Sequence, residues 1–382
     1  MTAYKMNDEL NRMVGIFKSD RPLPLESGGE LFNPQTVYET YGELNNDASN
    51  VILICHALTG SAHAAGEAIF PDEIIAEAPL LKKISGNFRG WWDEIIGPHK
   101  LLDTNKYFII SSNIIGSCYG ATGPLSKNEN GDIYRTDFPQ VTVRDIVRFQ
   151  KRLIDYLNIK KIKTVIGGSL GGMQVLEWAL LYPEIIESLI PIATASQHSD
   201  WCIGINHLQR QSIMNDPQWQ NGLYERQPQK GLSLARQIAM VSYRTAISFN
   251  ARFKHELKYG DRTNFNNDNI YQVESYLNYQ GRKLVDRFDA NCYIVLSRVL
   301  DAHDVGRSRG GVVKALSTVT QKALCIGIDS DILYPADEQK AISAALENAV
   351  YKEIGSPNGH DAFLIEYDQM NTIIKPFLES IS

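Results

Sequence analysis

Cysteine is scarce in this sequence, with five residues among 382. Cys55, Cys118, Cys202, Cys292 and Cys325 are scattered and form no C-x-x-C pair. Because most of them lie in apolar runs, we expect reduced thiols in the core of a cytoplasmic protein, not a disulfide framework. No HExxH motif and no close cluster of histidine and cysteine is present, so we expect no metal site.

Long apolar runs and an excess of positive charge are also missing. No run reaches the roughly 18 residues that cross a bilayer, and no apolar segment follows Met1 as it does in a signal peptide. The net charge is −6, and no basic stripe stands out along the chain. We therefore expect a cytoplasmic protein that binds neither nucleic acid nor membrane.

Strand and helix patterns alternate through much of the chain, which predicts an α/β fold with a mostly parallel sheet and helices on both faces. Residues 1–34 are polar and irregular, and we expect an N-terminal arm there. The expected strands are Gln35–Leu44 (antiparallel or at an edge), Val51–Cys55, Tyr107–Asn113, Thr164–Gly167, Ser188–Thr194, Ala323–Ile328 and Val350–Ile354. The expected helices run from a Thr142 cap to Leu157, over Gly171–Tyr182 and Ala336–Ala349, and to about Ser380.

Between Gln197 and Gly306 the strand patterns vanish, and amphipathic helices joined by polar loops replace them. Such an insertion after one strand of an α/β sheet is typical of a helical lid. We therefore predict a core formed by residues 1–196 and 307–382, with a lid over residues 197–306.

The strongest local signal is Gly167-Gly168-Ser169-Leu170-Gly171, a G-x-S-x-G match between a buried strand and a helix. Turning from strand to helix in so few residues strains the serine backbone and leaves no room for side chains at Gly167 and Gly171. Gly172 indicates close approach of helix and sheet. We expect Ser169 to be a nucleophile; a glycine turn in a buried βα unit is the alternative.

A serine nucleophile needs a base, and the base needs an acid partner. In the chain order of the α/β hydrolases, the acid and then the histidine follow the serine, each after a later strand. His360 lies at such a position, and Asp331 is favoured as the acid over Asp329. His56 and His63 precede the serine, so we interpret them as structural or as lining the pocket.

Two backbone amides are candidates for the oxyanion hole. Leu170 begins the helix after the serine, and Leu58 follows the strand Val51–Cys55. Removing one such donor typically costs on the order of 3 kcal/mol of transition-state stabilisation.

Four segments together resemble the homoserine O-acetyltransferases, α/β-hydrolase-fold enzymes of methionine biosynthesis. They are His56-Ala57-Leu58-Thr59-Gly60, Gly167–Gln174, Ser330-Asp331-x-Leu333-Tyr334-Pro335 and Gly359-His360-Asp361. The resemblance runs from about residue 20 to the C-terminus. It implies a ping-pong reaction, in which Ser169 accepts an acetyl group from acetyl-CoA and passes it to the side-chain hydroxyl of L-homoserine.

The resemblance also implies roles for other residues. Arg236 and Tyr243 match the positions at which the family holds the substrate carboxylate, and Asp361 matches the residue that takes the substrate ammonium. From the residues alone, Arg236 on a helix surface and Asp361 in a solvated loop are the alternatives. The family further implies acetyl-CoA as co-substrate without a bound cofactor, and a homodimer formed through the lid.

The choice of substrates leaves alternatives. Relatives that use succinyl-CoA carry arginine two residues after the catalytic aspartate, where this chain has Leu333, so we expect acetyl transfer rather than succinyl transfer. Serine is an alternative acceptor, and an esterase or thioesterase would use the same triad with water. A non-enzymatic scaffold would lack a triad member. Arg307 and Arg309 are candidates for CoA phosphates, with a basic turn leading back to the sheet as the alternative.

Overall fold

The computed structural model describes residues 2–86, 88–260, 262, 263 and 269–381. In these ranges the central sheet has nine strands in the order β1-β2-β5-β7-β6-β8-β9-β12-β13. The strands from β7 to β13 run parallel, and β5, β2 and β1 continue the sheet in antiparallel fashion. The bounds are β1 Thr2–Lys5, β2 Met13–Lys18, β5 Gln35–Tyr41, β6 Val51–Cys55, β7 Phe108–Ser112, β8 Thr164–Gly168, β9 Ser188–Ile192, β12 Lys322–Ile328 and β13 Ala349–Ile354.

The continuous apolar strands are covered on both faces, as their sequences predict. In β6, Val51, Leu53 and Cys55 join one hydrophobic cluster, whereas Ile52 and Ile54 join another on the opposite face. Helices α2 and α3 contribute to the first cluster and α11 to the second. These helices are α2 (Val143–Tyr156), α3 (Leu170–Leu181) and α11 (Tyr367–Glu379). The predicted α/β layers are therefore confirmed.

The expectation of an N-terminal arm is wrong. Strand β2 pairs along its whole length with β5, from Met13 opposite Thr40 to Lys18 opposite Gln35. Arg12, which is 1% exposed, donates hydrogen bonds to the carbonyls of Glu67 (2.9 Å) and Ile69 (2.7 Å). The prediction failed because several polar residues of this segment, which indicated an irregular arm, are buried and paired. The short hairpin of β3 (Leu23–Pro24) and β4 (Glu30–Leu31) follows.

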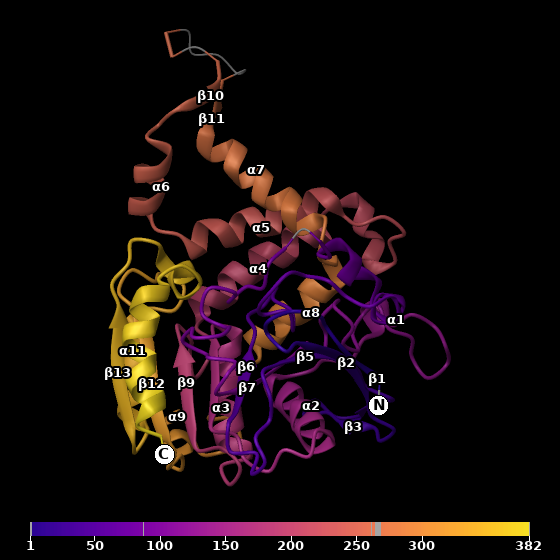
Figure 1. Cartoon of the computed structure of the whole chain (residues 1–382). Helices are drawn as coiled ribbons and strands as arrows, with labels where there is room; N and C mark the ends of the chain where they lie inside the picture. Colours follow the sequence, from indigo (N-terminus) through magenta and orange to yellow (C-terminus); the bar gives the residue numbers. More distant parts are fainter. Residues whose placement is uncertain (1, 87, 261, 264–268, 382) are drawn as a thin grey trace.

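Residues 197–306, which we call the insertion, leave the sheet after β9 and return before β12. Its helices gather at one end of the sheet, and the hairpin of β10 and β11 projects beyond them (Figure 1). The expectation that this region contains no strands is therefore wrong. The hairpin is short, with one residue pair on each side of an irregularity in the register. The elements are α4 (Asp200–Met214), α5 (Gln229–Tyr243), α6 (Ala246–Phe253), β10 (Leu257–Tyr259), β11 (Ile270–Tyr271), α7 (Gln272–Val285) and α8 (Ala290–Asp301).

The other expected elements are present, with small shifts at their ends. Thr142 caps α2 through a capping box with Asp145. Helix α10 (Ala336–Ala345) ends earlier than expected because Leu346 is extended and buried, which leads the chain into β13. Two short helices, α1 (Asp72–Glu77) and α9 (Val312–Leu316), complete the α-helices of the described ranges. None of the helices described combines the length and the apolar character that crossing a bilayer requires.

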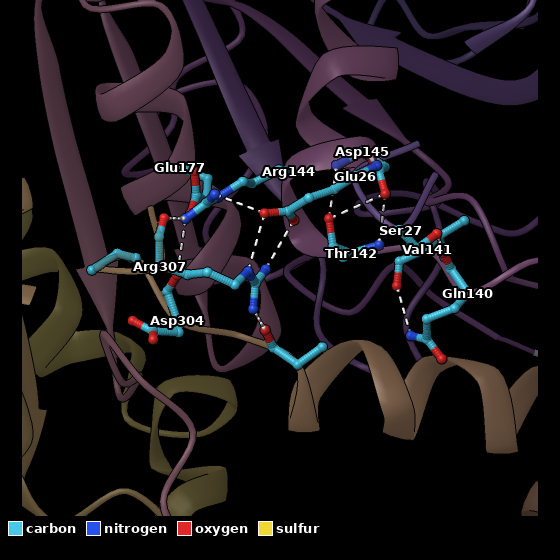
Figure 2. A network of polar contacts seen from close by, with 12 residues as sticks. Glu26, Ser27, Gln140, Val141, Thr142, Arg144, Asp145, Glu177, Asp304 and Arg307 are labelled. Atoms are coloured by element: carbon cyan, nitrogen blue, oxygen red, sulfur yellow. Dashed lines mark hydrogen bonds and ion pairs between the residues drawn. The ribbon is translucent and has the colours of Figure 1, made fainter. Parts of the chain in front are cut away.

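A network of charged side chains joins segments that are distant in the sequence (Figure 2). Arg144 of α2 contacts Glu26 at 2.7 Å and Glu177 of α3 at 3.1 Å. After the insertion, Arg307 pairs with Glu26 at 2.9 Å and Arg309 with Glu177 at 2.7 Å. Both arginines proposed as candidates for CoA phosphates are therefore occupied by carboxylates, and the alternative of a basic turn leading back to the sheet describes them.

Candidate active site

Ser169 occupies a strained turn between β8 and α3. Its backbone angles, φ 58° and ψ −125°, are rarely adopted by residues other than glycine. The turn is held on both sides, because the Ser169 N–H donates to the Ile192 carbonyl (3.0 Å) and the Thr194 hydroxyl donates to the Ser169 carbonyl (2.7 Å). The side chain lies at the carboxyl end of the parallel strands, where the sequence places it, and the residue is 7% exposed.

The glycines around Ser169 are required by close backbone contacts. A Cβ atom on Gly171 would lie 2.1 Å from the Cys55 carbonyl oxygen, and one on Gly167 would lie 2.7 Å from the same atom. A Cβ on Gly172 would meet the Thr194 side chain at 2.6 Å. A side chain at Gly167 or Gly171 would collide with the end of β6, and one at Gly172 would collide with Thr194 after β9, so the turn depends on all three glycines.

His360 and Asp331 come together from two loops. The His360 Nδ1 atom lies 2.7 Å from Asp331 Oδ2. The other oxygen, Oδ1, accepts the backbone N–H groups of Leu333 (2.8 Å) and Tyr334 (3.0 Å), which fixes the carboxylate. Burial alone would lower the pKa of His360, but the charge and hydrogen bond of Asp331 raise it above its ordinary value. Nε2 of the ring is therefore the atom available to exchange a proton.

Asp329, the alternative acid, has a different role. Its Oδ1 accepts the Ser356 N–H at 2.9 Å and so joins the loop after β12 to the loop after β13. Ser330 adds two bonds between the same loops, donating to the Ser356 carbonyl and accepting from the Gly359 N–H (3.1 Å). Asp329 and Ser330 thus position the loops that carry Asp331 and His360.

Three aromatic rings surround the His360 imidazole. Their centroids lie 5.2 Å (Tyr334), 5.6 Å (Tyr243) and 5.6 Å (Phe363) from the centroid of the imidazole. His360 itself is 4% exposed. These rings restrict the motion of the imidazole and keep water away from it. Tyr334 and Phe363 are absent from the site predicted by sequence, although both lie within four residues of a predicted member.

His56 and His63 are both buried, and His63 also lines a cavity together with residues 59–61, as the second interpretation predicts. Nδ1 of His56 bonds to the Ala57 carbonyl (2.8 Å), and burial lowers the pKa of His56 to about 4, so the ring is neutral. Nδ1 of His63 lies 3.2 Å from Glu39 and 3.0 Å from Arg12, and the three side chains form a buried cluster. Burial would raise the pKa of Glu39, but His63 and Arg12 lower it below its usual value.

The two candidate oxyanion donors belong to segments that follow adjacent strands, β6 and β8. The amide of Leu170 is the first of α3, so it has no partner within the helix. Leu58 follows β6, which pairs with β8 in register from Ile52 opposite Thr164 to Cys55 opposite Gly167. These adjacent strand ends bring the loop after β6, which we call the oxyanion loop (residues 56–61), to the start of α3.

A buried chain of amides holds the oxyanion loop. Gln174 of α3 donates to the His56 carbonyl (3.2 Å) and to the Leu170 carbonyl (3.1 Å). Its oxygen accepts from Gln150 of α2 (2.8 Å), whose own oxygen accepts from the Trp178 indole (2.8 Å). Gln174 and Gln150 are 0% and 3% exposed. Sequence analysis noted Gln174 only as part of a motif and missed this connection.

Among the predicted substrate residues, Tyr243 contacts His360, and Asp361 follows His360 in the chain. Arg236 of α5 stacks on the Tyr243 ring at 5.6 Å, and that ring in turn contacts His360. Asp361 forms an ion pair with Arg244 at 3.0 Å, a partner that sequence analysis did not anticipate. Arg244 also donates to Asn358 (3.0 Å). The end of α5 and the loop after β13 therefore bring opposite charges to one side of the site.

Comparison with known proteins places the chain in a family. The model of the alpha/beta hydrolase fold matches residues 50–367. The homoserine O-acetyltransferase of Moorella thermoacetica is 47% identical over 366 residues, which cover 94% of this chain and 94% of that protein. The homoserine O-acetyltransferase of Thermus thermophilus is 46% identical over 369 residues, covering 96% and 92%.

Solved structures agree. The homoserine O-acetyltransferase from Bacillus anthracis superposes with a TM-score of 0.86 at 29% identity, covering 96% of this chain and 97% of that one. Esterase E22 superposes with a TM-score of 0.85 at 27% identity, covering 96% and 100%. The predicted fold is thus confirmed, and the chain belongs to the homoserine O-acetyltransferase family of α/β-hydrolase-fold proteins.

Proposed function

We propose that this protein transfers an acetyl group from acetyl-CoA to the side-chain hydroxyl of L-homoserine, with Ser169 as the acetyl carrier. The observation that carries the proposal is the pairing of His360 with Asp331, at the end of the sheet where the strained turn presents Ser169. The near full-length identity to homoserine O-acetyltransferases supports the reaction and the acceptor. Acetyl-CoA acts as a co-substrate, and no resident cofactor is needed for this chemistry.

The first half-reaction forms the acetyl-enzyme. His360 Nε2 takes the proton of the Ser169 hydroxyl while its oxygen attacks the thioester carbonyl carbon. The tetrahedral intermediate collapses by breaking the C–S bond, and His360 returns the proton to the leaving CoA sulfur. Asp331 holds Nδ1–H and stabilises the imidazolium that forms between these steps.

The second half-reaction repeats this sequence with homoserine. His360 removes the proton of the homoserine hydroxyl, and the oxygen attacks the acetyl carbon on Ser169. Collapse breaks the bond to the Ser169 oxygen, which takes back the proton from His360. In both halves, the amides of Leu58 and Leu170 are the proposed donors to the negative oxygen.

The charges of homoserine fit the residues near the base. Arg236 offers a guanidinium fork to the carboxylate, and Tyr243 lies between Arg236 and His360. Asp361, already beside Arg244, is the proposed partner of the ammonium group. A substrate held at both charged ends presents its hydroxyl at one defined place, which accounts for a preference over water.

The acyl group is proposed to be acetyl. Leu333 is 7% exposed and belongs to the hydrophobic core, and its N–H donates to Asp331, so an apolar residue stands where relatives that use succinyl-CoA carry arginine. A succinyl carboxylate placed there would lose water without gaining a cation. We therefore expect acetyl-CoA to be used in preference to succinyl-CoA.

Hydrolysis is the second candidate, because an esterase shares the fold at a TM-score of 0.85. The test is a CoA-release assay with acetyl-CoA or succinyl-CoA, each with L-homoserine, L-serine or no acceptor. The proposal predicts rapid release only with acetyl-CoA and homoserine, and none in Ser169→Ala. Release independent of any acceptor would establish a hydrolase, and equal turnover of succinyl-CoA would overturn the acyl choice.

We also propose a homodimer formed through the insertion, in the cytoplasm. Helices α4 to α7 carry large exposed apolar side chains, whose burial would stabilise a dimer; examples are Leu208, Leu234, Val241, Ile247 and Tyr279. The five cysteines are free and buried, which supports a reducing compartment. Light scattering of the purified protein tests the dimer, and a monomer at micromolar concentration would refute it.

A further inference from the structure

A cavity of about 220 Å³ lies between the oxyanion loop and the insertion. Residues 59–61 of the loop form one edge, and α5 and α7 form another. Four cationic side chains line it: Arg89, Arg236, Lys283 and Arg287. Among the described residues that line the cavity, none is a carboxylate. A concave site of this charge, joined to the triad through Arg236 and Tyr243, is suited to an anion.

The four cations differ in what already binds them. Arg287 donates to the Thr59 carbonyl (2.8 Å) and the Tyr119 hydroxyl (2.9 Å), so it positions the oxyanion loop. Arg89 pairs with Asp93 at 3.1 Å. Within the described ranges, Arg236 and Lys283 have no carboxylate partner; each lies over an aromatic ring, Lys283 at 5.4 Å from Phe88.

The two cations that lack a carboxylate partner among the described residues lie at different depths. Arg236 is half-buried and stacks on Tyr243, which contacts His360, so it faces the reacting groups. Lys283 and Arg89 are exposed and lie toward solvent. Partial burial lowers the pKa of Lys283, and the nearby charges of Arg287 and Arg236 lower it further. Cations that repel one another in this way are relieved when a multiply charged anion binds.

We propose that Lys283 binds a phosphate group of the CoA thioester at the mouth of this cavity. This inference rests on the proposed function, because it assumes a CoA donor. The acetyl end of the donor must reach Ser169, and the pantetheine arm then keeps the phosphates away from the triad. Lysine suits this place because it binds phosphate as a point charge and needs no fixed geometry.

The test compares two acetyl donors that differ in charge. Acetyl-CoA carries phosphates, whereas S-acetylpantetheine has the same thioester and arm without them. In Lys283→Gln, the ratio of kcat/KM for acetyl-CoA to that for S-acetylpantetheine should fall about ten-fold, the effect of one charge-assisted contact. The fall should come from the KM for acetyl-CoA, and 0.5 M salt should diminish it.

Lys230→Gln is the matched control, because Lys230 is an exposed lysine of α5 that does not line the cavity. We expect its ratio to equal that of the unchanged protein. Equal loss with both donors in Lys283→Gln, or a rise in the KM for homoserine instead, would overturn the inference. Failure of the proposed function is distinguishable, because the unchanged protein would then transfer acetyl from neither donor to homoserine.

Discussion

Replacing Asp331 by asparagine keeps the size of the side chain but removes its charge and turns one acceptor oxygen into an NH₂ donor. The carboxylate uses its two oxygens differently: Oδ1 accepts two backbone N–H groups, and Oδ2 faces His360 Nδ1. An asparagine must place its amide oxygen where the two N–H donors of Leu333 and Tyr334 lie. Its NH₂ group is then turned toward His360, where it cannot accept a hydrogen bond.

The consequence is the wrong tautomer of His360. With a donor opposite Nδ1, the ring carries its proton on Nε2 and can no longer accept one from Ser169. The same change in a serine protease triad lowers kcat about 10⁴-fold, which equals about 5.5 kcal/mol of transition-state stabilisation. We expect a loss of this order in Asp331→Asn, because the two retained N–H contacts keep the loop in place.

The assay is steady-state CoA release with homoserine, measured across pH. Activity requires neutral His360, so the rate falls as pH drops through the pKa of this histidine, which Asp331 raises. In Asp331→Asn this support is lost while burial still lowers the pKa. The acidic limb of the residual kcat/KM profile should therefore move to lower pH.

Asp329→Asn is the control, since Asp329 lies two residues away and bonds to the Ser356 amide. We expect it to lower kcat by less than about ten-fold. The reasoning is refuted if Asp329→Asn proves more damaging than Asp331→Asn, or if Asp331→Asn keeps a tenth of the activity with an unmoved acidic limb. Circular dichroism of both variants verifies that they are folded.

Two further predictions concern residues that support the site. Gln174→Leu removes the donor to the His56 carbonyl, so the oxyanion loop loses a fixed contact. We expect kcat with homoserine and acetyl-CoA to fall about ten-fold. An unchanged kcat would show that other contacts hold the loop. Arg309→Leu leaves Arg144 as the one cation paired with buried Glu177 among the described residues, and should lower the free energy of unfolding by about 1–3 kcal/mol in urea titrations. We expect the folded Arg309→Leu variant to keep its kcat. If kcat also fell in the absence of urea, the network would shape the active site as well.

The pairing of Asp331 with His360 could be predicted from sequence because the signals of the proposed triad are local and ordered. Gly167, Gly171 and Gly172 indicate a turn with no room for side chains at these positions. Asp331 and His360 lie in loops that follow two later strands, in the chain order of the fold. Parallel strands bring their carboxyl ends to one edge, so order along the chain becomes proximity in space.

Other parts of the molecule depend on contacts that no local pattern reveals. Strand β2 lies in a polar segment, and its Gly15 is required by the Tyr38 ring, 23 residues later. The amide chain from Trp178 to the oxyanion loop joins two helices through side chains that read as ordinary polar residues. The packing of the insertion against the sheet brings Arg244 to Asp361 and gathers cations around Lys283, and sequence patterns do not predict this packing.

The backbone of Ser169 carries one more implication. For a residue with a side chain, the backbone angles φ 58° and ψ −125° cost about 1–3 kcal/mol of folding free energy. The packed glycines and the Thr194 hydroxyl hold Ser169 in this conformation. Glycine at this position would relieve the strain, giving a sturdier but inert protein. The fold thus keeps the residue on which acyl transfer depends in a strained backbone conformation. Selection for thermal stability alone would favour its replacement.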